Sequence, residues 1–222
     1  PARDALPKPR APRAPAAGAG PSDLASTGAP CNTFRMTTRA GRVLPMWAII
    51  AAAAVAGGLV TLVAVNMLGR YSGLTVPRTD PDALAHMLAP HARLSLPTEG
   101  AAPFPTVLLF SGCDGPKDNL VTWSAALNAA GWAALIVDSH TPRGLTDMQL
   151  WRLVCAGQLL TGGERASDVA VAVAEARKRP EVDGDRLALL GASHGGWAVL
   201  EYLSMADHGQ VPHALTRWPE SA

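Results

Sequence analysis

Residues 187–197 read Leu-Ala-Leu-Leu-Gly-Ala-Ser-His-Gly-Gly-Trp and contain a Gly-x-Ser-x-Gly motif at 191–195. The apolar run before the motif predicts a buried strand, and the spacing after it predicts a helix. This context is typical of a sharp strand-to-helix turn that strains the serine backbone and exposes its hydroxyl. Gly191 and Gly195 would leave room where strand and helix approach closely. We therefore predict Ser193 as a nucleophile; the plainer alternative is a Gly/Ser-rich turn.

A second glycine-containing loop, residues 111–115, follows another short apolar run. Ser193 sits at a predicted helix N-terminus, where backbone N–H groups favour developing negative charge. We predict that the backbone N–H groups of Cys113 and His194 form an oxyanion hole for a carbonyl attacked by Ser193. One such donor contributes about 3 kcal/mol to catalysis. The alternative is an ordinary glycine loop.

The rest of residues 101–222 alternates between strand and helix patterns. The pattern predicts an α/β fold, a parallel sheet with flanking helices and right-handed crossovers. A short helix over 81–88 and a strand over 92–96 are predicted before it. The predicted strands cover 106–110, 133–137 and 187–191, and the predicted helices cover 119–130, 145–160, 166–179 and 197–205.

Three motifs in this region carry a family resemblance. Residues 111–115, Ser-Gly-Cys-Asp-Gly, resemble the His-Gly-Cys-Gly-Gly loop of the dienelactone hydrolase-like family. Residues 138–144, Asp-Ser-His-Thr-Pro-Arg-Gly, resemble its Asp-Ser-Phe-x-Pro-Arg-Gly loop. The run 179–186, followed by Gly-Ala-Ser-His-Gly-Gly, is similar to the approach to its nucleophile. The resemblance covers about residues 100–205, and the main departure is Ser111, where the family usually has histidine.

This resemblance implies a partial α/β-hydrolase fold over 101–222 and hydrolysis of a small-molecule ester or lactone through an acyl-enzyme. It implies no metal and no organic cofactor. It also implies a cysteine after the 138–144 loop, a place that Cys155 fills. From the residues alone, Cys113 and Cys155 could form a disulfide or remain two buried thiols. Neither these two nor Cys31 has zinc-ligand spacing.

A serine nucleophile needs a histidine oriented by a carboxylate. In this fold the acid and the base follow the serine in the chain, yet only 29 residues follow Ser193. Asp207, His208 and His213 are predicted on the surface, on or just past the helix that leads away from Ser193. Asp138 and His140 precede the serine and are predicted in a capped turn. We expect the acid and base beyond residue 222, so this chain alone would be inactive.

Residues 1–100 are predicted to lie outside the α/β domain and to form three segments. Residues 1–42 are rich in Pro, Ala, Gly and Arg, and are predicted to be disordered. Residues 43–68 are predicted to form a transmembrane helix, because the twenty residues from 46 to 65 carry no charge and span ~30 Å as a helix. An uncleaved signal anchor is favoured over a cleaved signal or a core helix. Residues 69–100 are predicted as a linker.

Composition narrows the function class. A net charge of +1 gives no electrostatic argument for a nucleic-acid partner. We predict a single-pass protein of the cytoplasmic membrane with its C-terminal domain outside the cytoplasm, acting as a serine hydrolase. The alternative is a non-catalytic, membrane-tethered binding module on the same scaffold; an acyltransferase or a peptidase is a further alternative. The sequence does not determine the oligomeric state.

Overall fold

The computed structural model describes residues 45–220, so the disorder predicted for 1–42 lies outside the described residues. Within them, α1 (Met46–Tyr71) is a helix of 26 residues, and it is long and apolar enough to cross a membrane. None of its residues is buried. The helix continues three residues beyond the end predicted at residue 68, and the two residues 43–44 of the predicted span are not described.

One sheet of four strands forms the centre of the domain, in the order β1-β3-β2-β4. β2 pairs in parallel with β3 and with β4, which confirms the predicted parallel sheet, whereas β1 pairs antiparallel with β3. The connection from β1 to β2 is too short for the helical crossover that a parallel return requires, so the chain reverses direction. The strands are β1 (Ala92–Ser95), β2 (Phe104–Phe110), β3 (Ala133–Val137) and β4 (Val182–Gly191).

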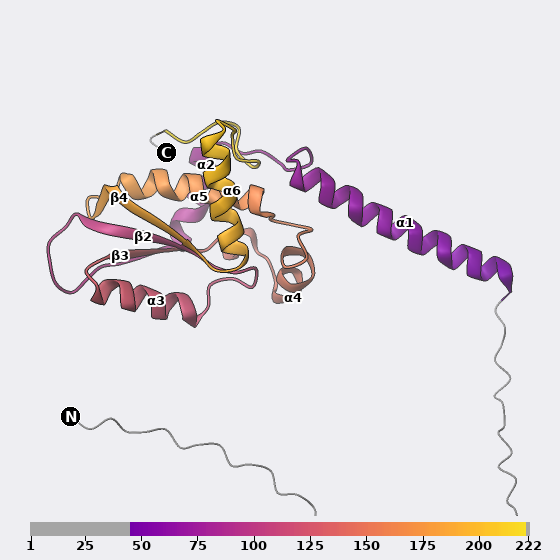
Figure 1. Ribbon diagram of the computed structural model, residues 1–222, viewed down its shortest axis with the longest axis horizontal. Helices are drawn as coiled ribbons and strands as arrows, with labels where there is room; N and C mark the ends of the chain where they lie inside the picture. The colour runs from indigo at the N-terminus through magenta and orange to yellow at the C-terminus, as the bar shows by residue number, and fades with distance from the viewer. Residues whose placement is uncertain (1–44, 221–222) are drawn as a thin grey trace, which may run out of the picture. The chain divides into compact units, whose positions relative to one another are not determined.

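Helices cover both faces of this sheet (Figure 1), with α3 on one face and α5 and α6 on the other. Successive β2 side chains point to opposite faces: Leu108 and Phe110 pack with α2, α5 and α6, whereas Leu109 packs with α3. Burial on both faces explains why β2 and β3 are continuous apolar runs. The run 187–191 in β4, which the sequence predicted to be buried, is only partly buried, because β4 has a neighbouring strand on one side only among the described residues. The covering helices are α2 (Pro81–Leu88), α3 (Asp118–Ala129), α5 (Gly162–Arg177) and α6 (His194–Asp207).

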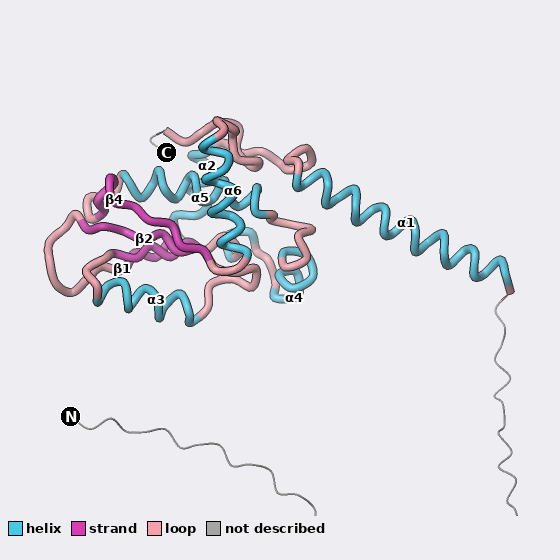
Figure 2. Tube along the Cα trace, in the orientation of Figure 1, coloured by secondary structure: helices cyan, strands magenta, loops and turns pink. Residues whose placement is uncertain are grey.

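The single helix predicted over 145–160 is wrong. The chain there forms α4 (Asp147–Gln149), then a π-helical turn (Leu150–Val154), then loop, as Figure 2 shows. Two local features prevent a continuous helix: Gly157 takes a positive φ of 68°, and Cys155 is held by a covalent cross-link to the loop after β2. The segment therefore bulges from the domain beside the C-terminal edge of the sheet.

The chain after α6 packs against the start of α2 without forming a further helix or strand of the sheet. Leu215 is fully buried, and Thr79 donates its N–H to Ala214 O at 2.9 Å. The Arg217 guanidinium lies 3.4 Å from an Asp80 carboxylate oxygen. These contacts join the residues between α1 and α2 to the residues that follow α6.

Candidate active site

Ser193 lies at the C-terminal edge of the parallel strands. Phe110 and Gly191 are paired in the last register position of β2 and β4, and Ala192 donates its N–H to Phe110 O at 3.0 Å. Ser193 then takes a φ of +48° and a ψ of −113°, and α6 begins at the next residue. A positive φ is rare for a residue other than glycine and reflects backbone strain. The strained, solvent-exposed serine therefore stands between strand and helix.

Two glycines make this turn sterically feasible. A Cβ atom at Gly191 would overlap the backbone of Gly195 and Gly196, and a Cβ atom at Gly195 would overlap the carbonyl oxygens of Phe110 and Ser111. The first turn of α6 thus lies so close to the end of β4 and to the end of β2 that neither position has room for a side chain.

The loop after β2, residues 111–115, runs beside the serine. One open groove is lined by Ser193, Cys113 and Trp197 among others, and a second by Ser193, Gly112 and Ala192. Because β2 and β4 are neighbours, their C-terminal loops meet at this edge, with Ser193 between the two grooves. Ser193 also precedes the first turn of α6, so the N–H of His194 belongs to the orphan donors of a helix N-terminus.

A disulfide joins Cys113 to Cys155 with a Cα–Cα distance of 5.0 Å. It connects the loop after β2 to the segment that follows the π-helical turn. Both cysteines line the groove that contains Ser193. The cross-link therefore fixes one wall of this groove.

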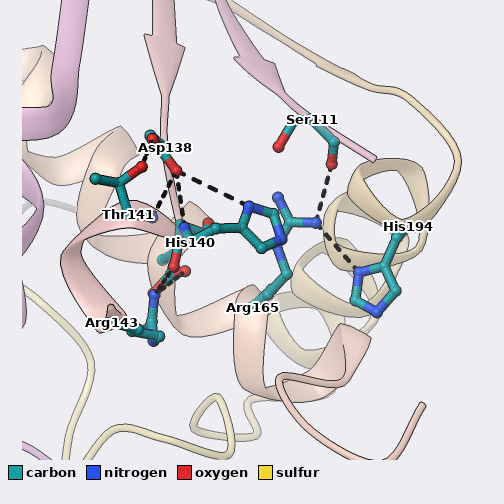
Figure 3. Close-up of polar contacts among 9 residues, drawn as sticks. Ser111, Asp138, His140, Thr141, Arg143, Arg165 and His194 are labelled. Carbon is teal, nitrogen blue, oxygen red and sulfur yellow. Dashed lines mark hydrogen bonds and ion pairs between the residues drawn. The ribbon is translucent and has the colours of Figure 1, made fainter. Parts of the chain in front are cut away.

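Arg165 is the main polar residue of the site that the sequence analysis missed. Its side chain on α5 is fully buried, and Nη1 donates to Ser111 O at 2.9 Å and contacts His194 Nδ1 at 3.1 Å (Figure 3). One guanidinium thus binds both the loop that contains Cys113 and the first residue of α6. The sequence carried no signal for this role, because Arg165 lies among other charged residues, Glu164 and Asp168, at the start of the helix.

The two histidines near Arg165 are held neutral. Burial, and then the positive charge of Arg165, lower the pKa of His194 to about 4. The same two causes lower the pKa of His140 to about 4, against the opposing effect of Asp138. Neutral His194 accepts a hydrogen bond from Arg165 through Nδ1. This contact directs the ring toward Arg165, so we do not assign His194 as the general base. Burial itself lowers the pKa of Arg165 to about 10.

Asp138 forms the capped turn that the sequence predicted. Its Oδ1 accepts from the N–H of His140 at 2.8 Å, and its Oδ2 accepts from the hydroxyl of Thr141 at 2.6 Å. Burial alone would raise the pKa of Asp138, but the hydrogen bonds from Thr141 and His140 outweigh it and lower the pKa. His140 Nδ1 lies 3.9 Å from Asp138 Oδ1, too far for a hydrogen bond.

The other acid and base candidates lie apart from the serine. The side chains of Asp207 and His208 are mostly exposed at the end of α6. His213 is half-buried rather than exposed, because its ring packs against Gly73 and Gly163. Among residues 45–220, no histidine or carboxylate side chain is hydrogen-bonded to the Ser193 hydroxyl.

No family model matches the chain. Over 103 residues it is 33% identical to dipeptidyl-peptidase 5 of Porphyromonas gingivalis, a match that covers 43% of this chain and 14% of that protein. Est1E of Butyrivibrio proteoclasticus, solved with ferulic acid, is 21% identical at a TM-score of 0.41, covering 53% of this chain and 44% of that one. A Klebsiella pneumoniae protein described as a dienelactone hydrolase is 18% identical at a TM-score of 0.42, covering 50% and 47%.

The chain therefore spans less than half the length of each of these proteins. The geometry itself gives a mainly parallel sheet with a strained serine after its strand β4. The described part is therefore an α/β domain with a sheet flanked by helices, and its loop motifs resemble those of the dienelactone hydrolase-like family.

Proposed function

We propose that this protein is a membrane-anchored serine hydrolase that cleaves an ester or lactone through an acyl-enzyme at Ser193. The observation that carries the proposal is the positive φ of Ser193, an exposed residue held between β4 and α6. Strain of this kind costs about 1–3 kcal/mol and persists where the surrounding structure enforces it. Here the close approach of Gly191 and Gly195 enforces it.

The oxyanion donors in this proposal are the backbone N–H groups of Cys113 and His194. Both residues line the groove beside Ser193. Among the described residues, neither N–H donates to another backbone carbonyl. Both are therefore available to a carbonyl oxygen that gains negative charge as Ser193 attacks.

Among the described residues, none is placed as the general base for Ser193 or as its carboxylate partner. His140 and His194 are neutral and could accept a proton, but both are turned toward Arg165. We therefore place the base and the acid outside residues 45–220, and expect those residues alone to be inactive. The role of Ser193 does not change if the partners come from another segment.

A peptide substrate is the second candidate, and the similarity to a dipeptidyl-peptidase favours it. Ester and amide cleavage share the acyl-enzyme at serine, so Ser193 and the two N–H donors would serve either. Rates with p-nitrophenyl acetate and with a dipeptidyl p-nitroanilide on the full-length protein separate the two. Faster cleavage of the anilide would support the peptidase.

Helix α1 supplies the membrane anchor in this proposal. Its length of 26 residues exceeds the ~20 that cross a hydrocarbon core. The residues that follow it form the hydrolase domain. We place this domain outside the cytoplasm, where the disulfide between Cys113 and Cys155 would persist.

A fluorophosphonate probe tests the proposal because it bonds covalently only to an activated serine. We expect the full-length protein to be labelled at Ser193, as located by mass spectrometry of the peptide. Ser193→Ala should abolish labelling, and Ser204→Ala, an exposed serine on the same helix, should leave it unchanged. A folded full-length protein that resists the probe would instead be a non-catalytic, membrane-tethered binding module.

A further inference from the structure

The last two turns of α1 bind the hydrolase domain directly. Asn66 Nδ2 donates to Gln158 O at 3.0 Å and to Gln158 Oε1 at 3.1 Å. Arg70 Nη1 pairs with Glu164 Oε1 at 2.8 Å, and the two side chains are only 18% and 8% exposed. An ion pair so shielded from water holds its partners more firmly than an exposed one. The end of the helix and the domain therefore meet in a fixed junction.

This junction reaches the groove beside the nucleophile. The ring of Tyr71 packs on that of Trp197 with a centroid distance of 5.1 Å. Both rings line the groove that also contains Ser193. The last residue of the apolar helix thus forms part of the wall next to the serine hydroxyl.

The length of α1 sets the height of this groove above a bilayer. Residues 46–65 span ~30 Å as a helix, which is the thickness of the hydrocarbon core. Asn66 follows as the first amide side chain, and Tyr71 lies five residues further, or ~8 Å along the axis. Headgroups add about 5–8 Å on each side. With residues 46–65 in the hydrocarbon core, as in the anchor proposed above, Tyr71 and the groove beside it would lie at the level of the headgroups.

The segment bound to Asn66 also exposes large apolar side chains. Met148 is 57% exposed, Trp151 68% and Leu153 36%. Leu153 O accepts from the Gln158 N–H at 2.7 Å, and Gln158 binds Asn66, so this turn lies beside the helix at the same height. Trp is enriched at membrane interfaces, because its ring is apolar while its N–H stays hydrated.

We propose that the groove beside Ser193 opens onto the bilayer surface and takes an ester that resides in the membrane. Met148, Trp151 and Leu153, the apolar turn, would enter the interface beside α1. The apolar chain of the ester would stay in the lipid while its carbonyl reaches Ser193. The proposal rests on the hydrolase function proposed above.

The chemistry of such a substrate is ordinary ester hydrolysis. Ser193 Oγ bonds to the carbonyl carbon, the bond from that carbon to the alcohol oxygen breaks, and the alcohol leaves with the serine proton. Water then attacks the acyl-enzyme, which releases the carboxylic acid and returns the proton to Ser193. A membrane-resident ester supplies both products without any co-reactant except water.

The contact with lipid is tested by fluorescence quenching. The full-length protein is placed in phosphatidylcholine vesicles whose acyl chains carry bromine near the headgroup. The chain has six tryptophans, so the Trp151 signal is taken as the difference between wild type and Trp151→Phe. We expect this difference signal to be quenched. The corresponding signal of Trp123, which is 37% exposed on α3 and lies on another face, should not be.

The substrate class is tested with two esters on the same preparation. p-Nitrophenyl palmitate is dissolved in the vesicles, and p-nitrophenyl acetate is dissolved in water. We expect Trp151→Ser to lower turnover of the palmitate by roughly threefold or more while turnover of the acetate is retained. Trp123→Ser should change neither rate.

The outcomes separate this inference from the function on which it rests. Turnover of the acetate with an unquenched Trp151 and no response of the palmitate to Trp151→Ser would overturn the membrane substrate and leave the hydrolase in place. Failure to turn over either ester, together with no fluorophosphonate labelling, would remove the hydrolase function and this substrate with it. Quenching of Trp151 with selective loss of palmitate turnover supports the inference.

Discussion

A single methyl group at position 195 would meet the carbonyl oxygens of Phe110 and Ser111. We expect Gly195→Ala to destabilise the domain by about 2 kcal/mol or more, because backbone atoms cannot move aside as a flexible side chain can. Thermal unfolding followed by circular dichroism measures this loss. Gly209→Ala is the control: no atom lies near its Cβ, and the residue has a φ of +64°, so the cost is that of left-handed strain, about 1–2 kcal/mol. Equal losses in the two variants would contradict the steric account.

Arg165 is expected to act on the reaction through the groups it positions. Asp168 keeps its pairing with Arg143 when Arg165 is replaced, so Arg165→Met should still fold. Labelling of Ser193 by a fluorophosphonate should slow by roughly tenfold to a hundredfold, because the loop after β2 and the start of α6 lose their common donor. The pKa of the His194 ring should rise from about 4, as followed by NMR.

Arg165→Lys should restore part of the labelling rate, since an ammonium can still donate to Ser111 O. Unchanged labelling in Arg165→Met, with the His194 pKa raised as expected, would show that the guanidinium affects the histidine but does not position the proposed oxyanion donors. A merely structural role would lower stability and leave the pKa of His194 where it is.

The geometry of single residues was predictable where the determining contact is local. Gly191, Ser193 and Gly195 make their decisive contacts within one turn and with the adjacent strand, so the motif itself carries the information. Arg165 could not be found in this way. Its partners Ser111 and His194 lie 54 and 29 residues away in the sequence, and only the folded sheet brings them together.

At the scale of elements, the disulfide ties the loop after β2 to the segment after the π-helical turn. It closes a loop of 42 residues, and such a cross-link stabilises a domain by about 3–4 kcal/mol. Cys155→Ser paired with Cys113→Ser should therefore lower the melting temperature and slow the labelling of Ser193. Calorimetry and the probe measure the two effects. A double variant with unchanged melting and labelling would show that the groove wall holds without the cross-link.

Element prediction succeeded where periodicity alone decides the structure. The strands 106–110, 133–137 and 187–191 lie within β2, β3 and β4. Continuous apolar runs suit the fully buried β2 and β3, and the run in β4 packs on both clusters although it is only partly buried. It failed over 145–160. There the apolar spacing fits a helix, but Gly157 and the cross-link at Cys155, neither visible as a period, set the course of the chain.

The molecule as a whole should lose stability in mild acid. His140 and His194 have a folded-state pKa of about 4 against an ordinary value of 6.5. Between these values the unfolded chain binds more protons than the folded one, so the free energy of unfolding falls as the pH drops from about 6.5 to 4. The loss is of the order of 2–3 kcal/mol for each histidine, and neither contributes a change above pH 7.

Urea unfolding at pH 7, 6, 5 and 4 measures this dependence. His140→Gln and His194→Gln should each reduce it, whereas His208→Gln, an exposed residue, should leave it as in the wild type. A free energy of unfolding that stays level from pH 7 to pH 4 would contradict the neutral state assigned to both buried rings.

Strand β4 has β2 on one side and no other described strand on the other. Along that outer margin, peptide N–H and C=O groups of β4 face outward, and an extended segment can add there by main-chain pairing alone. We expect residues 70–222, produced alone, to associate for this reason and to be poorly soluble. Since β4 also leads into Ser193, self-association along it would obstruct the proposed nucleophile, and aggregation and inactivation would rise together with protein concentration.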